Sequence, residues 1–261
     1  MTKKKCALVL ITGDRTHYLK QSIECCKSLI REYDHTLEVD VFLVSFDDID
    51  INLPNIKRLT YERPDINSDM VLNFPRSQQQ GSYDLETTKR ISLGHLILFG
   101  LIPDTIHRNV EIFKDYDFIL KSRSDLIFDF DKSAVKNLNI KEEILTFECF
   151  WGGCRYNKNY TNDHFVFGES EDVLKLISFS IESSMMNRFW NPEQYMTYLY
   201  SCINKRKVEM STNKYYLLSH DRNSRKFIGY PMEKINSDDK AFLESMELNL
   251  ESLNFTSEYD F

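Results

Sequence analysis

Residues 6–12 read CALVLIT, an unbroken apolar run of the kind that forms a strand buried on both faces of a sheet. Residues 13–33 then carry apolar side chains at helical spacing, which predicts a loop followed by a helix. Two further strands are predicted at residues 39–46 and 55–63. Strand, helix and strand in this order build a parallel sheet. The first part of the chain therefore predicts an α/β fold.

The remainder of the chain continues the same fold class. Residues 64–84 are polar and predict a loop or lid, and residues 85–102 carry a helical stripe. Further elements are predicted downstream: a strand beginning at 143, a short strand with a turn at Gly168 and then a helix, a helix over 191–206, and one or two strands within 208–227. We expect one domain over residues 1–235, an open, mostly parallel, twisted sheet flanked by helices. An acidic, helical C-terminal tail over residues 236–261 is expected to follow it.

The centre of the chain carries charges inside an apolar pattern. Residues 116–131 read YDFILKSRSDLIFDFD, in which two apolar runs flank Lys121, Arg123 and Asp125. The pattern predicts a strand, a bend and a second strand. Charged side chains at the bend then lie where the first strand ends.

Composition limits the possible partners. The chain has 261 residues, 42% of them hydrophobic, and a net charge of -7, which speaks against extensive nucleic-acid binding. Six Cys form no CxxC pair and no zinc-type spacing, so we interpret them as reduced thiols of a cytoplasmic protein. No window approaches the ~20 apolar residues of a spanning helix. We expect a soluble chain that at most contacts the inner face of a membrane.

Polar residues follow three of the predicted strands. Ligands of open α/β sheets collect at the carboxyl ends of the strands. An Arg fork matches a diphosphate, and a neighbouring carboxylate can hold a divalent metal that bridges phosphate oxygens. These positions therefore predict a nucleotide diphosphate site, with candidates Gly13, Arg15, Ser45, Lys121, Arg123 and Asp125.

A purely structural interpretation competes with this one. Arg123 could pair with Asp125 or Asp129 and stabilise the sheet without binding a ligand. Arg15 could be a surface side chain on a loop. The sequence leaves both alternatives open.

Several segments together resemble a known family. LITGDRTHYLKQSI, DVFLVSF, YDFILKSRSDLIF, NDHFVFGESEDVLKL and NPEQYMTYL occur in the order seen in WavE-type lipopolysaccharide synthesis proteins, over roughly residues 5–205. These look like glycosyltransferases of the GT-A fold. The resemblance implies a single GT-A-like domain, a nucleotide-sugar donor, and a glycan or lipid-linked glycan acceptor in surface polysaccharide synthesis.

The resemblance also implies a metal site, with one departure. GT-A enzymes usually carry Asp-x-Asp after a strand, and the last Asp binds the metal. Here the triplet is Arg123-Ser124-Asp125. A Mn or Mg ion on Asp125, with His220 completing the site, is one expectation. Charge neutralisation by Arg123 and Lys121 alone is the other, and a His220 that only bonds locally is equally compatible.

Two carboxylates are candidates for the catalytic base. An inverting transfer needs one carboxylate within hydrogen-bond reach of the acceptor hydroxyl. Asp163, just before an apolar strand, is the first candidate, and Glu193 is the rival, although Glu193 could simply begin a helix. Trp151, followed by two Gly, could stack on a sugar or be a core aromatic next to a turn.

Two other functions remain open at this point. A nucleotidyltransferase would use a similar sheet but favours a Gly-rich phosphate loop, whereas GDRTHYLKQ has one Gly. A non-catalytic glycan-binding protein would not need charged residues at its strand ends. The sequence favours a glycosyltransferase over both.

Overall fold

The computed structural model describes residues 3–12, 16–51, 53–74, 84–147, 163–185, 188–189, 192–210, 215–221, 224–230, 237–248 and 254–255. For residues 192–193, 215–221, 224–230, 237–240 and 254–255 the description covers the backbone.

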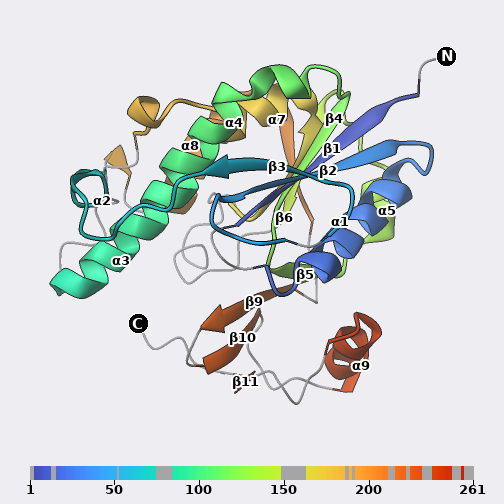
Figure 1. Ribbon diagram of the computed structural model, residues 1–261. Helices are drawn as coiled ribbons and strands as arrows, with labels where there is room; N and C mark the ends of the chain where they lie inside the picture. The colour runs from blue at the N-terminus through green and yellow to red at the C-terminus, as the bar shows by residue number, and fades with distance from the viewer. Residues whose placement is uncertain are drawn as a thin grey trace.

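The centre of the molecule is a twisted seven-stranded sheet (Figure 1). Its strand order is β3 (Ile56–Tyr61), β2 (Glu38–Phe46), β1 (Lys5–Ile11), β4 (Phe118–Arg123), β7 (Phe165–Glu169), β6 (Glu143–Phe147) and β8 (Arg206–Met210). β7 pairs antiparallel with both of its neighbours, and the other pairings are parallel. The predicted α/β class with a mostly parallel sheet is confirmed.

Helices cover both faces of this sheet. Alternate side chains of β1 enter two separate cores because successive residues of a strand point to opposite faces. Leu8 and Leu10 pack with α1 (Leu19–Tyr33) and α5 (Lys132–Lys136). Val9 and Ile11 pack on the other side with α4 (Ile102–Arg108), α7 (Ser170–Ile177) and α8 (Pro192–Ser201). Burial on both faces explains why the CALVLIT run contains no charged residue.

The second of these layers contains a long helical run with an irregular centre. α3 (Leu85–Leu96) continues through the π-helical turn η2 (Ile97–Leu101) into α4. The helix therefore ends at Arg108, beyond the predicted residue 102. A π turn inside an α-helix rotates the following side chains and often occurs at functional sites. Shorter segments complete the layer: α2 (Asp69–Asn73), η3 (Val110–Phe113) and η4 (Ile181–Ser183).

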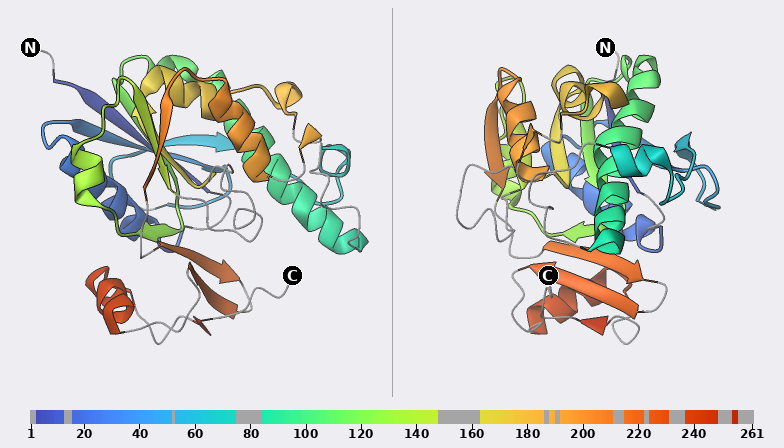
Figure 2. Two further views of the ribbon diagram at one scale, coloured as in Figure 1. Left: turned by 180° about the vertical axis from the view of Figure 1, so that it is seen from behind. Right: turned by 90° about the vertical axis from the view of Figure 1, so that its left-hand side faces the viewer.

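A second, smaller sheet lies below the first one (Figure 2). Its order is β11 (Asn254–Phe255), β10 (Ser224–Tyr230), β9 (Tyr215–Asp221) and β5 (Leu126–Phe128). The chain passes from β4 of the large sheet into β5 of the small sheet through Ser124 and Asp125. The predicted bend is thus a corner between two sheets.

The C-terminal region contains the expected helix, α9 (Ser237–Ser245), and also strand β11. Leu243 is fully buried in the core that contains α1. Lys20 of α1 and Glu247 form an ion pair at 2.9 Å. The domain boundary between residues 235 and 236 stays a prediction.

Three smaller findings complete the fold. Gly168 lies inside β7, so the predicted turn at this position is wrong; a Cβ on Gly168 would lie 3.0 Å from Ile144 Cγ1, which shows how closely β7 is packed. Cys6, Cys25 and Cys26 are buried free thiols and Cys202 is an exposed one. Among the described residues, no helix is long and apolar enough to cross a membrane.

Candidate active site

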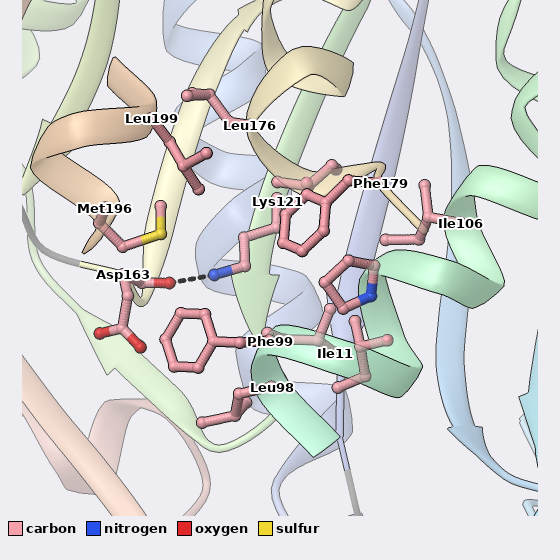
Figure 3. Close-up of a pocket in the computed structure, with 13 residues that line it drawn as sticks. Ile11, Leu98, Phe99, Ile106, Lys121, Asp163, Leu176, Phe179, Met196 and Leu199 are labelled. Atoms are coloured by element: carbon pink, nitrogen blue, oxygen red, sulfur yellow. Dashed lines mark hydrogen bonds between the residues drawn. The ribbon is translucent and has the colours of Figure 1, made fainter. Parts of the chain in front are cut away.

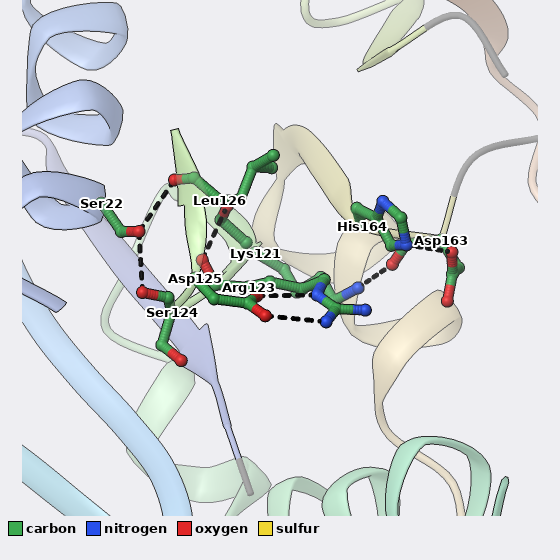
Figure 4. A network of polar contacts seen from close by, with 9 residues as sticks. Ser22, Lys121, Arg123, Ser124, Asp125, Leu126, Asp163 and His164 are labelled. Atoms are coloured by element: carbon green, nitrogen blue, oxygen red, sulfur yellow. Dashed lines mark hydrogen bonds and ion pairs between the residues drawn. The ribbon is translucent and has the colours of Figure 1, made fainter. Parts of the chain in front are cut away.

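The corner between β4 and β5 is fixed by main-chain contacts. The amide of Ser124 donates to the carbonyl of Ile11 at 3.1 Å, which extends the pairing with β1 by one residue. The buried hydroxyl of Ser22 on α1 lies 2.8 Å from the carbonyl oxygens of both Ser124 and Leu126 and shares its single proton between them (Figure 4). Asp125, between these two residues, is therefore held on both sides by α1.

Arg123 and Asp125 form a two-pronged ion pair at this corner. Nε and Nη2 of Arg123 donate to Oδ1 and Oδ2 of Asp125, each at 2.9 Å (Figure 4). The Asp125 side chain is almost fully buried, and 14% of the Arg123 side chain is exposed. Such parallel hydrogen bonds between a guanidinium and a carboxylate are strong and fix both groups. This is one of the two pairings that the structural interpretation of the sequence anticipated.

Asp163 lies beside this pair because β7 runs antiparallel to β4. The beginning of β7 therefore lies at the edge of the sheet where β1 and β4 end. Asp163 precedes β7 by two residues, and its carbonyl accepts a hydrogen bond from the ammonium of Lys121. Its carboxylate lies 3.2 Å from Nε2 of His164. The structure thus brings together four charged groups at one edge: Lys121, Arg123, Asp125 and Asp163 (Figure 4).

Burial sets the charge state of the groups around Asp163. It lowers the pKa of Lys121 to about 8 and that of His164 to about 4. His164 is therefore neutral near pH 7 and can donate its Nε2 proton to the carboxylate. Burial alone would raise the pKa of Asp163, but His164 and the cations Lys121 and Arg123 outweigh it and hold that pKa below its usual range. Asp163 is therefore ionised near pH 7.

A small cavity adjoins Lys121 between the sheet and the helices (Figure 3). Its volume is about 30 Å³, the order of one or two water molecules. Lys121 and Asp163 are its polar lining residues, and the apolar ones come from β1, the η2–α4 run, α7, α8 and the segment after α7. The Lys121 side chain borders this cavity, and its ammonium donates to the Asp163 carbonyl.

Sequence reasoning missed two histidines near Asp163. His95 of α3 is buried, and burial lowers its pKa to about 4 even though the negative Asp163 acts in the opposite direction. His95 stood inside an apolar helical stripe, so nothing in the sequence distinguished it from a core residue. His164 offered one signal, since it adjoins Asp163 directly before the apolar strand.

Ser45, at the end of β2, has a hydroxyl with protein partners. The hydroxyl donates to the carbonyl of Phe46 at 3.1 Å and accepts from Nη2 of Arg58 at 3.4 Å. Arg58 also donates to the Phe46 carbonyl at 3.0 Å. Ser45 is fully buried, and these contacts tie β2 to β3.

The other predicted site residues are described in part or not at all. Gly13, Arg15 and Trp151 lie outside the described residues. Glu193 lies in α8 and His220 in β9, opposite Arg225 of β10, and only their backbones are described. Their roles stay predictions.

The described donor atoms do not match a divalent metal site. Within the described part of the chain, no three His, Cys, Asp or Glu side chains gather closely enough to hold a metal ion. Both oxygens of Asp125 accept from Arg123, and a metal ion there would compete with the guanidinium. The metal on Asp125 and His220 stays a prediction.

Comparisons with known proteins give only distant likenesses. No family model matches this sequence. No curated protein matches it. Among solved structures, the chain is similar to an active-site mutant of LgtC with a TM-score of 0.42 and 9% identity, covering 77% of this chain and 72% of that one. The galactosyltransferase LgtC in complex with donor and acceptor sugar analogues gives 0.40 and 11%, covering 77% and 73%.

A third structure is a complex of a mutant Drosophila β-1,4-galactosyltransferase 7 with manganese, UDP-Gal and xylobiose. Its TM-score is 0.43 at 10% identity, covering 80% of this chain and 65% of that one. TM-scores of 0.40 to 0.43 mark likenesses too distant for any function to follow from them.

Proposed function

We propose that this chain is a glycosyltransferase that moves a sugar from a nucleotide-sugar donor to a glycan acceptor. The observation that carries the proposal is the juxtaposition of an ionised carboxylate, Asp163, with Lys121 and Arg123 at the edge where β1 and β4 end. Ligands of α/β sheets bind at this edge. The sequence resemblance over residues 5–205 supports the same assignment.

The proposed reaction needs two opposite charges at that edge. The bond between the sugar and the diphosphate breaks, and the acceptor hydroxyl forms a new bond to the same sugar carbon. The leaving nucleoside diphosphate gains negative charge, which a positive group must stabilise. The acceptor hydroxyl loses a proton, which a carboxylate must accept.

Asp163 is the proposed base. It is ionised near pH 7, and His164 orients its carboxylate. A low pKa makes Asp163 a weak base, so the proton transfer is expected late, when the sugar–diphosphate bond is largely broken. Glu193 of α8 is the alternative base.

The donor side is proposed at Arg123 and Asp125, together with the loop after β1. Arg15 is proposed to face the diphosphate, and Gly13 allows a close approach of the backbone. Positive charge comes from Arg123 and Lys121, or from a metal on Asp125 and His220. Ser45 and Trp151 are proposed as further contacts to the donor.

The biological setting is proposed from the resemblance. The acceptor is a glycan or lipid-linked glycan of a surface polysaccharide or lipopolysaccharide. The reaction takes place in the cytoplasm, with the chain at most in peripheral contact with the membrane.

A donor panel tests the proposal. Purified protein is incubated with UDP-, GDP-, CMP- and ADP-sugars and an acceptor mixture, and release of the nucleoside phosphate is measured. One donor is expected to turn over, and Asp163→Asn is expected to lower kcat by about 10²- to 10⁴-fold. Asp115→Asn, an exposed residue before β4, is the matched control and should keep full activity.

Two results would overturn the proposal. Absence of turnover and of binding with every donor would leave a non-catalytic protein. Release of pyrophosphate from a nucleoside triphosphate, without sugar transfer, would indicate a nucleotidyltransferase.

A further inference from the structure

The pairing between β4 and β7 stops before it reaches Asp163. Paired residues run from Phe118 opposite Glu169 to Ser122 opposite Phe165. Asp163 lies two residues before the last pair. The described ladder between these strands therefore does not fix its main chain.

Lys121 makes the contact that the ladder lacks. It stands opposite Val166, and its side chain extends along β7 to donate to the carbonyl of Asp163 (Figure 3). A lysine has a long, flexible stem, so it can reach a carbonyl beyond the end of the paired strands. This hydrogen bond links the start of β7 to the middle of β4.

The surroundings of Lys121 make it an unfavourable residue for stability. Only 7% of its surface is exposed, and apolar side chains line most of the cavity, including Ile11, Phe99 and Met196. Removing an ammonium from water is costly, and burial opposes the charged form of Lys121 strongly enough to lower its pKa to about 8. Packing alone would therefore favour Met at this position over Lys.

The carboxylate of Asp163 has its own partner. His164 Nε2 lies 3.2 Å from Oδ1, and the His164 side chain is almost fully buried. The two contacts are complementary, because Lys121 holds the main chain of Asp163 and His164 holds its carboxylate. Together they restrict where the carboxylate can lie.

We propose that Lys121 is a positioning residue for the base Asp163, an inference that rests on the proposed function. In this role Lys121 acts on the Asp163 carbonyl, and Arg123 is the described cation that remains for the donor diphosphate. It keeps the Asp163 main chain in place at the cost of burying an ammonium. Catalysis is then expected to depend on Lys121 more strongly than the stability of the fold does.

Hydrogen exchange tests the contact without any assay of activity. In Lys121→Met, the peptide covering residues 163–166 is expected to exchange about tenfold faster than in the wild type, because the start of β7 opens more often. Peptides of β1 and β2 should be unchanged. The melting temperature should change little, because relief from burying the ammonium offsets the lost hydrogen bond to the Asp163 carbonyl and the lost attraction to its carboxylate.

Lys205→Met is the matched control. Lys205 is also mostly buried, but it binds the carbonyl of Ile140 at 3.1 Å and the carboxylate of Glu169 at 2.6 Å, at the opposite end of β7. This variant should leave exchange at residues 163–166 unchanged. Equal exchange there in wild type and Lys121→Met would overturn the proposal.

Kinetics separate positioning from donor binding. Once a donor is identified, Lys121→Met should lower kcat about 10- to 100-fold and leave the donor KM unchanged. Lys121→Arg should restore part of kcat, since a guanidinium can donate to the same carbonyl and the cavity of about 30 Å³ leaves space for it. A raised donor KM with unchanged kcat would instead place Lys121 in the donor site and overturn the proposal.

The two proposals fail in different ways. If the wild type turns over no donor, the glycosyltransferase assignment fails, while the exchange experiment still reports on the Lys121 contact. If the wild type is active and Lys121→Met keeps full kcat, the positioning role fails and the assignment stands.

Discussion

The guanidinium of Arg123 donates a hydrogen bond to each carboxylate oxygen of Asp125, with Nε–Oδ1 and Nη2–Oδ2 distances of 2.9 Å each. The pair sits at the corner where the chain leaves one sheet for another. Each partner is therefore the other's counter-charge in a site with little access to water. This relationship leads to two separate predictions.

Removing one partner of the pair should destabilise the fold strongly. Arg123→Ala leaves the buried Asp125 carboxylate without this counter-charge, and losses of about 3–5 kcal/mol are typical of such changes. Urea unfolding gives the free energy. The double variant Arg123→Met/Asp125→Leu should recover most of the loss because neither charge remains. Equal losses in single and double variants would show that the pair does not act as a unit.

The same pair should control access of a metal ion to Asp125. Without nucleotide, Mn²⁺ should raise the melting temperature of the wild type little, because the ion must displace the guanidinium. Arg123→Lys frees one or both oxygens and should respond more strongly to Mn²⁺. Asp125→Asn is the control: whether Arg123 is present or replaced by Lys, Mn²⁺ should not raise the melting temperature of a variant that carries it. A large rise in the melting temperature of the wild type with Mn²⁺ would show that the ion displaces the guanidinium easily.

Two buried histidines should make the protein sensitive to acid. Burial lowers the pKa of His95 and His164 from the ordinary 6.5 to about 4. Between pH 6.5 and pH 4 the unfolded chain therefore binds more protons at these two histidines than the folded chain does. Their contribution to the free energy of unfolding is fully present above pH 6.5 and is lost as the pH falls toward 4. Each histidine accounts for about 3 kcal/mol of this loss.

Unfolding free energies at several pH values between 7 and 4 measure the effect. His95→Gln removes one titrating group and should reduce the pH dependence by about half. His35→Gln, which changes an exposed histidine, is the control variant. A wild-type stability that does not change over this pH range would contradict the burial of both imidazoles in neutral form.

Two glycines of the α3–η2–α4 run should respond oppositely to the same substitution. A Cβ on Gly94 meets no atom within 4 Å, so Gly94→Ala should stabilise by about 0.5–1 kcal/mol through helix propensity. A Cβ on Gly100 would lie 2.9 Å from Phe74 Cε2 and 3.2 Å from Leu96 Cδ1. Gly100→Ala should therefore cost about 1–3 kcal/mol. Thermal unfolding of both variants measures the difference, and equal shifts would contradict the packing at the π turn.

Much of the fold could be predicted because its strands are apolar runs. β1 and β2 are buried on both faces, and continuous apolar residues identify such strands directly. Gly168 was misassigned because glycine most often marks a turn. Here its missing side chain leaves the space that Ile144 and Val173 fill beside a closely packed strand. The π turn was not predictable, because an apolar stripe does not reveal which hydrogen bonds the backbone makes.

The candidate site was predictable only where its residues are near in sequence. Arg123 and Asp125 stand two positions apart around a bend, so their pairing was one of the foreseeable outcomes. Lys121 and Asp163 meet because β7 returns antiparallel beside β4, which no local pattern indicates. The contact between Lys121 and the Asp163 carbonyl was therefore not foreseen, and the expected contact of Lys121 with a phosphate stays a prediction.

The corner at Ser124 and Asp125 also bears on the order in which the molecule assembles. β4 pairs with β1, which precedes it in the chain, whereas β5 pairs with β9, which follows it, from Leu126 opposite Leu217 to Phe128 opposite Tyr215. Synthesis proceeds from the N-terminus, and a strand can pair only after its partner has been made. During synthesis, the large sheet around β1 can form while β5 still lacks this neighbour. The Asp125 side of the site is thus expected to become rigid last, and an N-terminal fragment without β9 should fold its first βαβ unit yet hold this corner loosely.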